Sequence, residues 1–121
     1  MPFDVMPVID PVDQQCVNLL KHVRYHILAS ERRWTKLTNQ RGYLWWRRFC
    51  VTGAIMHTAS KYNYSFNSAR TVCEALDQVA KRYGHYSIVH LNDHCKTTHG
   101  YLLAVLNDAQ RDLEHRNAFA P

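Results

Sequence analysis

Several features that would assign a function at once are missing from this chain of 121 residues. No apolar run approaches the ~18 residues that a membrane-spanning helix needs, so the sequence predicts no such helix. The chain contains no CxxC pair, no Gly-rich phosphate loop, no Gly-x-Ser-x-Gly and no His-Glu-x-x-His. No motif therefore specifies a reaction, and the sequence predicts neither a resident metal nor a cofactor.

The first ten residues also lack the character of a secretory signal. They have no basic start, they carry Asp4 and Asp10, and Pro2 and Pro7 interrupt them. Prolines are poorly tolerated inside helices and central strands, so we expect residues 1–10 to form an extended arm. Because nothing directs the chain to secretion, we expect a cytoplasmic protein whose four cysteines stay reduced.

The composition is that of a single globular domain, with 46% hydrophobic and 21% charged residues. The formal net charge of +5 is unevenly distributed. Between Lys21 and Arg48 lie eight basic residues and one acidic residue, Glu31, whereas the rest of the chain carries a small acidic excess. A basic segment on a nearly neutral body points to an acidic partner, either nucleic acid or an acidic protein surface.

Apolar residues that recur every three or four positions predict an all-α fold, a single small bundle of about four amphipathic helices. Asp10-Pro11 is a strong helix start, and Gly84 a strong helix end. The expected helices are Pro11 to Arg32, Trp45 to Ser60, a cap at Ser65 or Asn67 to Gly84, and Thr97 or Thr98 to Glu114. The helical domain would thus span 11–116, followed by a tail at 117–121.

Two connections carry particular expectations. Residues 34–44 are of mixed polarity with several turn formers, so we expect a loop that contains at most a short extended piece. Residues 85–93 have an apolar centre that is too short for an independent helix, and they form either a buried extended connector or a single helical turn. In both interpretations Asn92-Asp93 closes a turn.

Three segments together resemble a family of small helical bacterial and phage proteins of unknown function. These segments are Glu31-Arg32-Arg33-Trp34, Phe49-Cys50-Val51-Thr52-Gly53-Ala54-Ile55 and Ser87-Ile88-Val89-His90-Leu91-Asn92-Asp93. The resemblance covers roughly Cys16 to Leu113, and it departs from the family pattern at Arg33 and Leu91. It implies a shared helical fold, but it implies no activity.

Histidine and cysteine supply the weaker candidates for chemistry. His22 and His26 have the i, i+4 spacing that can hold one metal ion, although half-buried histidines are ordinary beside an apolar helix face. A denser group could ligate zinc or hold a reactive thiol: His90, Asp93, His94, Cys95 and His99. The structural interpretation of that group is favoured, since Asp93 would cap a turn, Cys95 would pack, and His90 and His99 would lie on the surface.

The most functional-looking feature is a basic and aromatic segment. We predict a partner-binding face formed by Arg32, Arg33, Trp34, Lys36, Arg41, Tyr43, Trp45, Arg47 and Arg48. Arginine with tryptophan and tyrosine dominates protein hot spots, and the same side chains pair with phosphates and stack on unpaired bases. The alternative is that the segment binds no partner: Trp46 and one other tryptophan would then belong to the core, and the arginines would form a solvated face.

We interpret the chain as a non-enzymatic interaction protein, of the kind that phages or mobile elements encode. It would bind an acidic protein or a protein–nucleic acid machine, for example as an inhibitor of a host defence complex. Direct nucleic-acid binding is the alternative, and a zinc- or thiol-dependent enzyme is a third hypothesis. The exposed tryptophans would serve a homodimer interface equally well.

Overall fold

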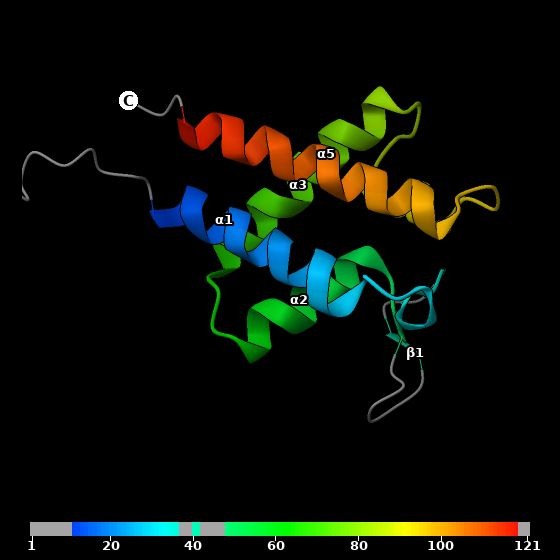
Figure 1. The fold of residues 1–121 in the computed structure, drawn as a ribbon, viewed down its shortest axis with the longest axis horizontal. Helices are drawn as coiled ribbons and strands as arrows, with labels where there is room; N and C mark the ends of the chain where they lie inside the picture. Colours follow the sequence, from blue (N-terminus) through cyan, green and yellow to red (C-terminus); the bar gives the residue numbers. More distant parts are fainter. Residues whose placement is uncertain (1–10, 37–39, 42–47, 119–121) are drawn as a thin grey trace, which may run out of the picture.

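The computed structural model describes residues 11–36, 40–41 and 48–118. Along this part of the chain the elements are α1 (Pro11–His22), the π-helical turn η2 (Val23–Ile27), the 3-10 turn η3 (Glu31–Arg33), strands β1 (Gln40–Arg41) and β2 (Arg48–Phe49), and helices α2 (Val51–Lys61), α3 (Phe66–Arg82), α4 (Ile88–Asp93) and α5 (His99–Ala118). Figure 1 shows a predominantly helical molecule, which confirms the predicted all-α class. The predicted arm and most of the predicted tail lie outside the described residues.

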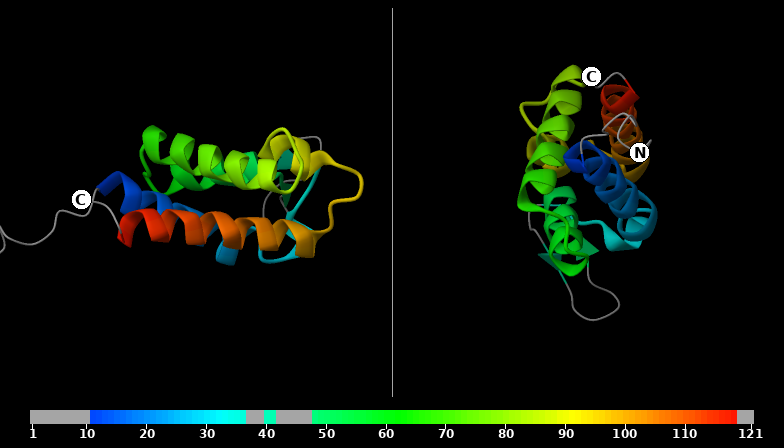
Figure 2. Two further views of the ribbon diagram at one scale, coloured as in Figure 1. Left: turned by 90° about the horizontal axis from the view of Figure 1, so that it is seen from above. Right: turned by 90° about the vertical axis from the view of Figure 1, so that its left-hand side faces the viewer.

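The core lies where α1, α3 and α5 pack on one another, as the end-on view of Figure 2 shows. Most residues of the predicted apolar stripes are buried there: Cys16, Leu19, Leu20 and, on the adjoining π-helical turn, Val23; Ala69, Val72, Leu76, Val79 and Ala80; Leu102, Val105, Leu106, Ala109 and Leu113. Phe66 and Tyr83, which the predicted stripe of α3 included, are exposed. Helix α2 covers one end of this group, in contact with both α1 and α3. None of the described helices is long and apolar enough to cross a membrane.

The first helix ends earlier than the sequence predicts. Its α-helical part ends at His22, and the chain continues as a π-helical turn in which Leu28 N–H donates to the Val23 carbonyl at 2.8 Å. A separate 3-10 turn follows, capped by the Ser30 hydroxyl, which accepts a hydrogen bond from Arg32 N–H at 3.3 Å. The predicted end at Arg32 is therefore wrong, because a serine cap restarts the backbone at residue 30.

The segment before α2 is extended where the sequence predicts helix. Gln40 pairs with Phe49 and Arg41 with Arg48 in a short antiparallel ladder, and Thr35 N–H donates to the Phe49 carbonyl at 2.9 Å. Helix α2 begins only at Val51, with Cys50 as its N-cap. The expectation that helix starts at Trp45 is thus wrong at Arg48-Phe49, while the short extended piece predicted within 34–44 is confirmed.

The remaining boundaries follow the expected caps closely. Ser65 caps α3, accepting from Ser68 N–H, and Gly84 follows the helix with φ +88°, a conformation that glycine adopts without strain. Residues 88–93 form one short helix capped by Ser87, which selects the helical alternative for this connection. Helix α5 continues past the predicted end at Glu114 to Ala118.

Candidate functional site

Asn92 is the polar centre that fixes the loop after η3 to the helical body. Its Oδ1 accepts hydrogen bonds from Trp34 Nε1–H at 2.8 Å and from Val51 N–H at 3.1 Å, and its Nδ2 donates to the Thr35 carbonyl at 3.2 Å. The residue is only 2% exposed. One side chain on α4 thereby joins two segments that are 41 to 58 residues away in sequence.

Trp34 consequently does not belong to a binding face. Its side chain is 8% exposed and packs in the core, with the indole N–H satisfied by Asn92. The prediction that Trp34 meets a partner is wrong, because an indole that buries its ring and finds an internal acceptor gains more than one left in water. Trp34 instead anchors the loop after η3 to the helical body.

Lys36 is committed to an internal contact as well. Its ammonium group donates to the His94 carbonyl at 2.6 Å and lies 5.3 Å from the centre of the Trp34 ring. Lys36 therefore closes the C-terminal end of α4 and covers the buried indole. Its role in partner binding stays a prediction beside this structural one.

The other members of the predicted face divide into two groups. Arg32 and Arg48 are exposed, and Arg33 is half-buried. Arg41 contributes its backbone to β1. The side chain of Arg41 lies outside the described residues, as do Tyr43, Trp45 and Arg47.

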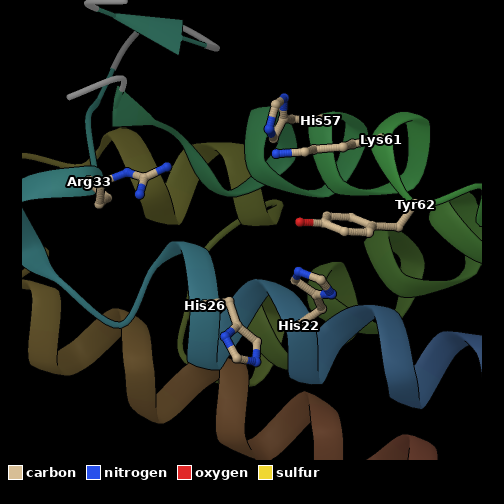
Figure 3. Close-up of a pocket in the computed structure, with 6 residues that line it drawn as sticks. All are labelled: His22, His26, Arg33, His57, Lys61 and Tyr62. Carbon is tan, nitrogen blue, oxygen red and sulfur yellow. The ribbon is translucent and has the colours of Figure 1, made fainter. Parts of the chain in front are cut away.

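A pocket next to Arg33 gathers basic side chains from three parts of the chain (Figure 3). It encloses a volume of about 450 Å³ and is lined by His22, His26, Arg33, His57, Lys61 and Tyr62. Helix α1 and the π-helical turn form one wall, α2 forms the facing wall, and η3 brings Arg33 to one end. Among these lining residues five are basic, one is a tyrosine and none carries a carboxylate.

Local structure explains how the lining residues converge. His22 immediately precedes the π-helical turn and His26 lies within it, and their rings lie 5.0 Å apart in an edge-on arrangement. The Tyr62 ring reaches across to within 4.3 Å of the His22 ring, and Figure 3 shows its hydroxyl directed into the pocket. His57 and Lys61 occupy i, i+4 positions on α2, so they share one helix face. π-helical turns occur frequently at functional sites, which fits this placement.

The surroundings of His22 in the pocket disfavour its protonated, positively charged form. Burial lowers the pKa of His22, and the neighbouring His26 and Lys61 lower it further. A smaller hollow of about 310 Å³ adjoins the pocket and shares His22 and His26 with it. The arrangement offers positive charge and hydrogen-bond donors to a ligand, and these favour an anion.

The sequence drew attention to His22 and His26 as a metal pair, but not to the pocket as a whole. Two further pocket residues, His57 and Lys61, repeat the same i, i+4 spacing on the next helix. The sequence feature that could have indicated the pocket is the occurrence of two basic pairs, each spaced i, i+4, on successive helices. Among the described residues, no group of three or more His, Cys, Asp or Glu side chains is arranged to hold a metal ion.

The predicted group at His90 to His99 separates into different environments. His90 and His94 come together with His85, which the sequence analysis did not single out, and the three ring centres lie 5.0 to 5.9 Å apart. Asp93 accepts a hydrogen bond from the Asn92 side-chain amide at 2.9 Å. Cys95 is exposed, so the expectation that it packs is wrong. His99 is half-buried, and its Nε2 lies 2.7 Å from the Leu28 carbonyl, so its expected place on the surface is wrong.

Cys50 has a structural use, and the surroundings of Cys73 disfavour its thiolate. All four cysteines, each within the described part of the chain, are thiols and not disulfides. Cys50 Sγ accepts the Gly53 N–H at 3.3 Å as the cap of α2. Burial, with Asp77 and Glu74 nearby, raises the pKa of Cys73 to about 11, which keeps that thiol protonated and unreactive at neutral pH.

The cluster of His85, His90 and His94 should make the protein sensitive to acid. His85 Nδ1 and His90 Nδ1 lie 2.9 Å apart, which requires one of them to be an acceptor, and burial followed by His90 and His94 lowers the pKa of His85. Because the folded-state pKa lies below the ordinary 6.5, the unfolded chain takes up the proton first. This contribution to stability is present above about pH 6.5 and is lost as the pH falls through the lowered pKa.

When the pH is lowered from about 7.5 to about 5, we therefore expect the free energy of unfolding to fall less for His85→Gln than for the native protein. The measurement is the urea midpoint at both pH values. His115→Gln, a change on the last turns of α5, serves as the control and should retain the full native loss. Equal losses in all three proteins would contradict the assignment.

Comparison with known proteins adds the family. A family model described as "Family of unknown function (DUF6197)" matches residues 11–112, which is nearly the whole of the described helical body. Neither a curated protein nor a solved structure matches the chain. The chain therefore belongs to the DUF6197 family of unknown function.

Proposed function

We propose that this protein is a non-enzymatic interaction protein that takes an acidic segment of another protein on its basic face. By basic face we mean the six pocket residues together with the exposed Arg32 and Arg48. The observation that carries the proposal is a pocket whose lining includes five basic residues, from α1, η2, η3 and α2, and no carboxylate. The charges of Arg33 and Lys61, together with the hydrogen-bonding groups of the three histidines, favour an anion in this concave site.

The exposed arginines extend this charge beyond the pocket. Arg32 lies beside Arg33 on η3, and Arg48 lies on β2, which contacts η3. Glu31 is the one acidic residue between Lys21 and Arg48, so the segment keeps a large positive excess. An acidic peptide bound beside Arg33 would therefore lie in a region of the chain that carries further positive charge.

An acidic protein is favoured over nucleic acid by the shape of the site and by the position of Trp34. Proteins that bind single strands usually combine a basic track along the backbone with aromatic rings on which bases stack. Here the basic side chains converge on one hollow, and the Trp34 indole is enclosed in the core. Convergent charges suit one carboxylate-bearing or similarly charged side chain better than they suit a long polyanion.

The test compares labelled probes that carry the same number of negative charges. A glutamate-rich peptide, a single-stranded DNA and a double-stranded DNA are titrated with the protein, and binding is followed by fluorescence anisotropy at several salt concentrations. We expect the peptide to bind most tightly. Lys61→Glu and Arg33→Glu should each weaken it at least about tenfold, because they place like charges in contact.

Matched controls use exposed lysines that do not line the pocket. Lys81→Glu on α3 and Lys96→Glu after α4 change the net charge by the same amount. If these controls weaken binding as much as Lys61→Glu does, the basic face is rejected. Tighter binding of DNA with a steep loss of affinity in salt would instead assign the face to nucleic acid. Circular dichroism of each variant verifies that the helices persist.

A further inference from the structure

The pocket offers more donors than a carboxylate can use. Lys61 presents an ammonium group with three donors, and the Tyr62 hydroxyl is directed into the space. Arg33 and His57 line the pocket besides taking part in interactions within the protein, and His22 adds a ring nitrogen. A carboxylate has two acceptor oxygens, whereas a phosphate monoester has three and carries up to two negative charges at neutral pH.

We propose that this pocket binds the phosphate monoester of a phosphorylated side chain on the acidic partner, an inference that rests on the proposed function. The volume of about 450 Å³ accommodates the phosphate together with the side-chain atoms that carry it. Binding in this pocket is coupled to the uptake of a proton by the protein, and His22 is the group that takes it. The affinity for a doubly charged oxyanion consequently rises as the pH falls.

The proton uptake follows from the charges around His22. It faces His26 on the π-helical turn, Lys61 and Tyr62 at the end of α2, and shares the pocket with His57 and Arg33. Burial lowers the pKa of the His22 imidazole, and His26 and Lys61 lower it further. A bound dianion reverses the sign of the local field, so the protonated ring becomes the favoured form and donates to the ligand.

The proton-uptake step is tested with inorganic sulfate, which remains a dianion throughout the relevant range, so that only the protein titrates. Between about pH 7.5 and about pH 6 we expect the affinity of the native protein for sulfate to rise roughly tenfold. His22→Gln should lose most of this rise, and His115→Gln should keep it. Calorimetry in two buffers of different ionisation enthalpy measures the protons taken up. A native affinity independent of pH overturns the coupling.

The choice of ligand is tested with three peptides of one sequence. Glutamates surround a central phosphoserine, glutamate or serine, and inorganic phosphate is titrated separately. We expect the phosphopeptide to bind at least about tenfold more tightly than the peptide with central glutamate. Lys61→Gln and Arg33→Gln should remove that advantage, whereas Lys81→Gln should leave it unchanged.

The outcomes separate this inference from the proposed function. Equal and measurable affinity for the phosphopeptide and the peptide with central glutamate leaves the acidic-protein proposal standing and overturns the phosphate assignment. Binding of inorganic phosphate alone overturns the docking of a phosphorylated side chain and replaces it with a site for a small phosphate. Absence of binding by every probe overturns both proposals.

Discussion

Replacing Asn92 with leucine is expected to lower the free energy of unfolding by about 3 kcal/mol, a large part of the stability of a domain of this size. The substitution removes the acceptor shared by Trp34 Nε1–H and Val51 N–H, and the donor to the Thr35 carbonyl. Each buried group left without its partner loses the hydrogen bonds that water provides in the unfolded chain. Urea unfolding followed by circular dichroism measures the change.

Asn18→Leu is the matched control for this substitution. Asn18 is exposed, and its side chain accepts one hydrogen bond from Gln14, so the expected change is below about 0.5 kcal/mol. A second comparison isolates the indole. Adding Trp34→Phe to Asn92→Leu should cost less than Trp34→Phe costs alone, because the unsatisfied N–H is then already present. Additive effects would show that Asn92 does not hold the indole.

Truncating Leu106 to alanine is the second change with a large expected effect, about 3 kcal/mol of lost stability. Leu106 is fully buried on α5, where that helix meets α1 and α3. The loss combines the transfer of the removed carbon atoms with the cavity that they leave in a close-packed core. Chemical denaturation of both proteins at one temperature gives the difference.

Leu103→Ala on the same helix makes the same chemical change at a partly exposed position. It should cost clearly less, since less apolar surface is returned to water and the site can relax. If Leu103→Ala proved as harmful as Leu106→Ala, the three-helix packing of α1, α3 and α5 would be the wrong description of the core.

The periodicity of apolar residues predicted the three core helices well, because a helix that is buried on one side has apolar residues at every third or fourth position. The apolar stripe of α5 coincides with buried residues, and that of α3 does so between Ala69 and Ala80, whereas Phe66 and Tyr83 at the ends of the α3 stripe are exposed. Ser65 and Gly84 bound α3 as their local chemistry requires. Periodicity did not predict the extended conformation of Arg48-Phe49. Its extended conformation is set by partners at Gln40 and Thr35, which are distant in sequence, rather than by its own residues.

The candidate site was harder to foresee for the same physical reason. Trp34 lies in a stretch rich in arginine, and only the position of Asn92, 58 residues away, determines that its ring turns inward. The pocket joins His22, Arg33 and Lys61, whose separations in the chain carry no periodic signal. The net positive charge of the region could be read directly from the sequence, whereas the point at which it converges depends on packing.

The π-helical turn at Val23–Ile27 has a consequence for comparing members of the family. Such a turn spans one residue more than an α-helical turn between the same flanking positions, as the hydrogen bond from Leu28 to Val23 shows. Removing one residue would restore a regular helix and rotate the following side chains by roughly 100° about its axis. We expect relatives that are one residue shorter between Leu20 and Leu28 to have no histidine at the position aligned with His26, so the length of this segment distinguishes members that keep the pocket from members that do not.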